Sequence, residues 1–111
     1  MPPKRNPLNL NPLQLKTLTL LQELARLIGS PAEADGILIP ELPHPHGDHF
    51  HLGDAVVATR DASGLANQAA WVALERKGLI KSMFPDAAVL TPAGQAYDTG
   101  LADALLHRSD H

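Results

Sequence analysis

The stretch from residue 51 to residue 97 most constrains the fold of this 111-residue chain. A longer helical pattern ends before Gly78, and glycine stops helices because it adopts a positive φ without strain. Alternating apolar residues then predict a β-hairpin over 79–91. Upstream, the pattern predicts a short helix over 55–59 and a tight turn over 60–64. The expected order is therefore two helices joined by a turn, followed by a hairpin.

A first helix is predicted over residues 12–28. Asn11 is a good N-cap, the proline after it suits the first turn, and Gly29 is a good stop. Most of its leucines share one face, but Leu15 and Leu18 fall outside that face. A second apolar face predicts a homodimer through the first and last helices. The alternative is that the last helix covers this face within one chain.

The sequence also predicts the ends of the domain and the segments that connect its helices and strands. Prolines and asparagines predict an extended arm over residues 1–11, followed by a single domain over 12–107 and a frayed tail over 108–111. Breaker-rich residues 30–47 predict a long connection, with room for a short helical turn over 32–34 and for a short strand or a packed apolar segment over 36–40. A final helix is predicted over 93–107, and its two glycines weaken it, with a break expected near the second.

Composition narrows the classes of function. The formal net charge is −3 with only 9 Lys and Arg residues, so any surface that binds phosphate must be local. The chain has no cysteine, no apolar run of membrane-spanning length and no signal-peptide pattern, which is typical of a cytoplasmic protein. It also lacks a phosphate-binding glycine loop and a nucleophile motif, so we do not expect an enzyme.

Two short motifs carry a resemblance to a known family. Residues 74–80 read L-E-R-K-G-L-I, and residues 90–94 read L-T-P-A-G. Both resemble the winged-helix domains of bacterial MarR-type transcription regulators. The resemblance implies a mainly α winged helix-turn-helix with about four helices, a small β-wing and a two- to three-stranded antiparallel sheet. It places the recognition helix at about 64–77 and the wing at about 79–91, with a short strand at 50–52 beside the wing.

The resemblance also implies sequence-selective binding of double-stranded DNA in transcription regulation. Amide side chains on a recognition helix read adenine edges, and basic side chains hold phosphates. The residues expected at this interface are Lys4, Arg5, Arg60, Ser63, Asn67, Gln68 and Lys81. The apolar and acidic wing tip and the scarcity of basic residues favour an alternative, a protein–protein interaction module that does not bind DNA.

Histidines gather just before the predicted helix-turn-helix. His44, His46, Asp48, His49 and His51 have ligand types that suit Zn²⁺ or Ni²⁺, although no cofactor is required. These residues predict a regulator that responds to metal, or to pH through imidazole protonation. The alternative is a polar loop whose histidines are solvated or pack on the sheet.

Overall fold

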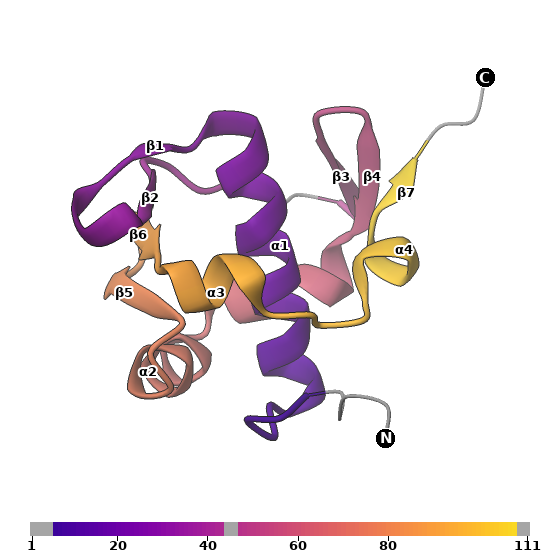
Figure 1. Ribbon diagram of the computed structural model, residues 1–111. Coiled ribbons are helices and arrows are strands. Elements are labelled where there is room, and N and C mark those ends of the chain that lie inside the picture. Colours follow the sequence, from indigo (N-terminus) through magenta and orange to yellow (C-terminus); the bar gives the residue numbers. More distant parts are fainter. Residues whose placement is uncertain (1–5, 44–46, 109–111) are drawn as a thin grey trace.

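The computed structural model describes residues 6–43 and 47–108. Helix α1 (Pro12–Ile28) lies between two antiparallel sheets (Figure 1). The Asn11 side chain accepts from the Gln14 amide, and the Gln14 side chain accepts from the Asn11 amide. This reciprocal cap satisfies two amides that the helix itself leaves unpaired. The first helix is therefore confirmed with its predicted ends.

The first sheet has four strands. Their spatial order is β1 (Ser30–Pro31), β2 (Ile37–Ile39), β6 (Ala87–Leu90) and β5 (Ile80–Met83). A 3-10 turn, η1 (Glu33–Asp35), connects the first two strands. The inward side chains of Ile39, Ile80 and Leu90 are almost fully buried in the common core. The predicted hairpin is present as β5 and β6, and the breaker-rich connection supplies two further strands.

The second sheet consists of β3 (His49–Leu52), β4 (Ala55–Ala58) and β7 (His107–Arg108). Gly53, with φ +57°, lies in the turn between β3 and β4. The predicted helix over 55–59 is wrong, because burial alternates along β4 and two of its residues are β-branched valines, which favour strands. The predicted strand at 50–52 exists, but it pairs with β4 and not with the hairpin.

Between β4 and the hairpin lie a 3-10 helix, η2 (Thr59–Ala66), and helix α2 (Gln68–Arg76). The predicted turn over 60–64 is therefore helical, and the predicted recognition helix begins four residues later than about 64. Gly78 has φ +77°, as expected of a glycine that stops a helix.

The break expected near Gly100 in the predicted final helix is present, but the helical residues end at Leu105 and not at 107. The segment is divided into α3 (Pro92–Ala96) and α4 (Ala102–Leu105), and the chain then continues into β7. Gly100 has φ +72°, which a helix does not allow. The Thr19 and Thr99 hydroxyls are hydrogen-bonded at 2.6 Å, so α1 holds the segment between the two short helices.

The mainly α winged helix-turn-helix prediction is corrected by this architecture. The described residues form a small α/β protein with a four-stranded and a three-stranded antiparallel sheet around α1 (Figure 1). Short apolar runs in the breaker-rich connection and before η2 pair as strands, because pairing satisfies their backbone groups while they bury their side chains. No helix among these residues has both the length and the apolar character needed to cross a membrane.

Candidate functional site

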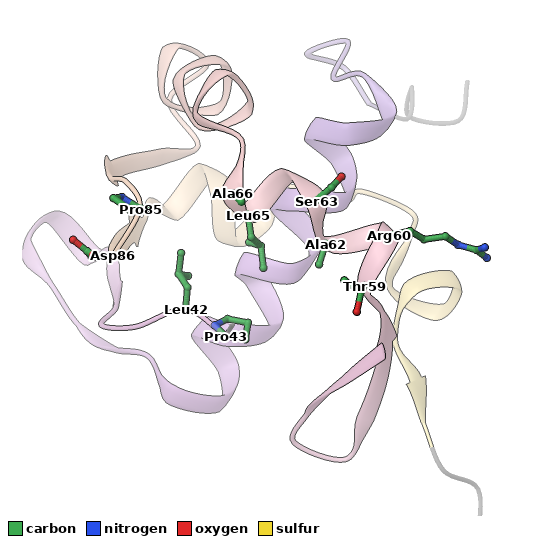
Figure 2. Close-up of a pocket in the computed structure, with 10 residues that line it drawn as sticks. All are labelled: Leu42, Pro43, Thr59, Arg60, Ala62, Ser63, Leu65, Ala66, Pro85 and Asp86. Atoms are coloured by element: carbon green, nitrogen blue, oxygen red, sulfur yellow. The ribbon is translucent and has the colours of Figure 1, made fainter. Parts of the chain in front are cut away.

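A groove beside η2 is the most apolar concave surface among the described pockets. Its volume is about 510 Å³, within the range of roughly 300–1,000 Å³ that ligand pockets occupy. We call it the η2 groove, and Figure 2 shows the side chains around it. The lining residues come from the segment after β2, from η2 and from the β5–β6 turn: Leu42, Pro43, Thr59, Arg60, Ala62, Ser63, Leu65, Ala66, Pro85 and Asp86.

The η2 wall is held in place by contacts with α1 and α2. Lys16 forms an ion pair with Asp61 at 3.0 Å. The Trp71 indole N–H donates to the Gly64 carbonyl at 3.1 Å, in a buried position. A side chain at Gly64 would overlap Thr17, so only glycine allows η2 to approach α1 this closely. The η2 wall of the groove is therefore anchored to the core through α1 and α2.

The opposite wall is the turn between β5 and β6. The Phe84 ring meets Trp71 edge to face, with ring centroids 5.2 Å apart, and this contact fixes the turn against α2. Pro85 and Asp86 follow directly and remain exposed on the groove side. The same tryptophan therefore positions both walls.

Four polar residues also line the groove: Thr59, Arg60, Ser63 and Asp86. The buried Thr59 hydroxyl oxygen has no hydrogen-bond partner among the described residues. A buried polar atom without a partner costs about 1–3 kcal/mol, and because solvent does not reach this oxygen it offers no contact to a molecule in the groove. Arg60 and Asp86 are both exposed, and neither forms an ion pair within the part of the chain that the structure describes. Figure 2 shows the Arg60 side chain pointing away from the other lining residues, so the groove offers mainly apolar walls, with the Asp86 carboxylate on the hairpin side.

The predicted DNA-contacting residues lie in three separate places. Arg60 and Ser63 line the η2 groove. Asn67 and Gln68 are exposed at the start of α2. Lys81 lies on β5 opposite Val89 of β6, and it lines a smaller pocket on one face of the four-stranded sheet. Lys4 and Arg5 lie outside the described residues.

Asn67 was predicted to contact DNA bases, but in the structure its side chain has a different role, at the start of α2. Its side-chain oxygen accepts from the amides of Ala69 and Ala70, at 3.0 and 3.4 Å, and caps α2. Ser63 and Asp61, which are also good capping residue types, lie inside η2 and do not cap α2. The oxygen of Asn67 is therefore already engaged.

We expect Asn67→Ala to lower the free energy of unfolding by about 1 kcal/mol, the usual effect of losing an N-cap. Gln68→Ala serves as the control, because Gln68 is an exposed neighbour with no recorded side-chain hydrogen bond among the described residues. Urea denaturation of both variants measures the difference. Equal stability of the two variants would show that the cap contributes nothing.

Only part of the predicted metal cluster can be located. Asp48, His49 and His51 are exposed near or on β3, whereas His44 and His46 lie outside the described residues. The His49 and His51 rings are 5.7 Å apart, and His49 Nδ1 is 2.9 Å from the Asp48 carboxylate. The hydrogen bond with His49 holds the pKa of Asp48 below its ordinary value.

No group of three potential metal ligands that could hold an ion is found within residues 6–43 and 47–108. The response to metal or pH therefore stays a prediction. Alternation along β3 explains why the histidines share the exposed face, since Phe50 and Leu52 occupy the buried one.

The apolar surface of α1 is covered within the chain. Leu18 is fully buried, and Leu15 is partly buried against the same core. The second apolar face that suggested a dimer is thus occupied, in part by the second sheet and η2, which the sequence pattern did not predict. The homodimer stays a prediction without that support.

Most wall residues of the η2 groove were not identified from the sequence. The apolar and acidic hairpin tip was noticed, but Leu42, Pro43 and Thr59 carry no motif and come together only in the fold. Comparison with family models, with curated proteins and with solved structures found no match. The resemblance to MarR-type regulators stays a prediction that rests on the two short motifs.

Proposed function

We propose that this protein is an interaction module that binds an apolar segment of a partner polypeptide in the η2 groove. The observation that carries this proposal is the groove itself, with apolar walls contributed by three chain segments. Peptide-binding grooves combine apolar contacts with a few polar groups that pair with the peptide backbone.

The distribution of charge favours a polypeptide over a nucleic acid. Nucleic-acid binding needs several basic side chains on one surface. Here Arg60 lines the groove, Lys81 lines a separate pocket, and Lys16 is paired with Asp61. Asp86 adds a negative charge to the groove.

A charge placed in the groove should remove binding. Peptides selected from a displayed random library provide the probe, and fluorescence anisotropy measures their dissociation constants. We expect Ala66→Glu to weaken binding about tenfold or more, because the new carboxylate must lose water against apolar walls. Ala69→Glu is the matched control, since Ala69 is also exposed and lies nearby but outside the groove.

Two results would contradict this proposal. One is a selection that yields no peptide with affinity above background. The other is equal weakening by Ala66→Glu and Ala69→Glu, which would place the contact surface on α2 and not in the groove. Circular dichroism of both variants checks that the fold is retained.

A second candidate is sequence-selective binding of double-stranded DNA. The observation that favours it is the solvent face of α2, where Gln68, Val72 and Arg76 are exposed at intervals of four residues. In that case a random duplex should bind with strong salt dependence. Ala69→Glu should then weaken binding more than Ala66→Glu, the reverse of the order expected for a groove ligand. Absence of binding at low salt would remove this candidate.

A further inference from the structure

We propose that His49 and His51 on β3 form a surface site for a divalent transition-metal ion, with Asp48 orienting the His49 ring. This site goes beyond the proposed function and does not depend on the η2 groove. It is also narrower than the cluster of five residues expected from the sequence, because only two imidazoles bind the ion and the carboxylate has a supporting role.

The strand register places the two histidines on the same exposed face of the second sheet. His49 and His51 are two residues apart on β3, so their side chains point to the same side. Pairing of His49 with Ala58 and of His51 with Val56 fixes this orientation. The two β3 residues that alternate with the histidines are buried in the core. A shift of the strand by one residue would bury both histidines, so the register is firmly set.

The two imidazole rings are already close enough to share one ion. Their centroids are 5.7 Å apart. An imidazole nitrogen binds zinc at about 2.0–2.1 Å, so two rings on one ion have their centroids within about 6.5 Å of each other. Rotation of two side chains on a fixed strand is therefore enough to bring one nitrogen of each ring to the ion.

Asp48 fixes which nitrogen of His49 is available. His49 Nδ1 lies 2.9 Å from a carboxylate oxygen of Asp48. An ionised carboxylate can only accept, so Nδ1 carries the hydrogen and Nε2 keeps a lone pair for a metal. The Asp48 backbone is itself held, because its carbonyl accepts from the Thr59 amide at 3.0 Å. A carboxylate that orients a histidine in this way also raises the basicity of the ligand nitrogen.

The ligand types select the class of ion. Imidazole suits Cu²⁺, Ni²⁺ and Zn²⁺, whereas Mg²⁺ and Ca²⁺ prefer oxygen ligands. No third histidine or carboxylate completes a metal-binding group with this pair within the described residues. Water therefore fills the remaining coordination positions, and Cu²⁺ should bind more tightly than Zn²⁺, as it does to most nitrogen sites.

The test is titration of the full chain with Cu²⁺ and with Zn²⁺ by calorimetry. His49→Ala and His51→Ala should each weaken binding about tenfold or more, because one of two protein ligands is lost. Asp48→Ala should weaken it about tenfold, the lower end of the range for losing a partner that orients a ligand. The electron paramagnetic resonance spectrum of the Cu²⁺ complex should show two imidazole nitrogens in the wild type and in Asp48→Ala, but one in each histidine variant.

His107→Ala is the matched control. His107 is exposed on β7 and pairs with Val56 from the side opposite to His51, so it lies on the same face of the sheet but two strands from β3 (Figure 1). It should bind both ions as the wild type does. Circular dichroism of every variant checks that the fold is retained.

Three results would overturn the proposal. The first is unchanged affinity in both His49→Ala and His51→Ala. The second is equal weakening in His107→Ala, which would indicate unspecific binding to exposed histidines. The third is a loss confined to a His44→Ala/His46→Ala double variant, which would assign the ligands to the earlier part of the histidine run.

Discussion

Trp71→Ala is expected to lower the free energy of unfolding by about 3–5 kcal/mol, the range for removing a large buried aromatic side chain. Trp71 is fully buried. It supports both walls of the η2 groove, through its hydrogen bond to the Gly64 carbonyl and its edge-to-face contact with Phe84. The alanine leaves a cavity in the core and removes one of the two hydrogen bonds that the Gly64 carbonyl accepts, the other coming from the Asn67 amide.

Trp71→Phe separates the contribution of the buried aromatic ring from that of the hydrogen bond to Gly64. A phenylalanine keeps most of the apolar volume and the aromatic contact but cannot donate to Gly64, whose carbonyl keeps its bond from the Asn67 amide. The expected loss is therefore about 0.5–1.5 kcal/mol, the net contribution of one hydrogen bond. Urea denaturation followed by circular dichroism measures both variants. A loss below about 1 kcal/mol for Trp71→Ala would show that the core closes around the site and that this tryptophan does not hold the walls together.

Gly94→Ala is expected to lower the free energy of unfolding by about 3 kcal/mol, at the upper end of overpacking effects. A methyl group at Gly94 would overlap the Leu79 carbonyl oxygen. That oxygen belongs to the backbone and cannot rotate away. The position is also held on both sides, because the Gly94 amide donates to Thr91 and its carbonyl accepts from Gln22.

Gly78→Ala is the matched control. A side chain at Gly78 would meet no atom within 4 Å, but the residue has φ +77°. The expected loss is about 1–2 kcal/mol, the conformational penalty of this backbone region for an L-residue. Chemical denaturation of both variants gives the comparison. If Gly94→Ala loses no more than Gly78→Ala, α3 can shift away from Leu79 and the close approach is not essential.

The elements that local signals define were predicted correctly from the sequence. Asn11 and Gly29 bound α1, and Gly78 follows the last turn of α2. These signals act within a few residues, through a capping side chain or a backbone conformation that glycine favours. The hairpin after Gly78 also follows from alternation and a turn at Pro85 and Asp86.

The errors concern segments whose structure depends on distant partners. Residues 55–58 are short and apolar, so periodicity does not separate a helical turn from a strand, and pairing with β3 decides the matter. Residues 93–107 have a helical composition, but contact of Thr99 with α1 and pairing of β7 with β4 divide the segment. Interpreting Gly94 as a weakness of that helix missed its close packing against Leu79.

The sequence by itself determined where α1 and α2 end and where the hairpin lies, because capping residues and turn glycines act on their immediate neighbours. Only the tertiary structure decided that residues 51–97 divide between two sheets around α1. It also decided that Arg60 lines one groove with Leu42 and Asp86, whereas Lys81 lines another pocket. The physical reason is that strand pairing and core packing join residues far apart in the chain. A local sequence pattern does not specify which distant segment a strand pairs with.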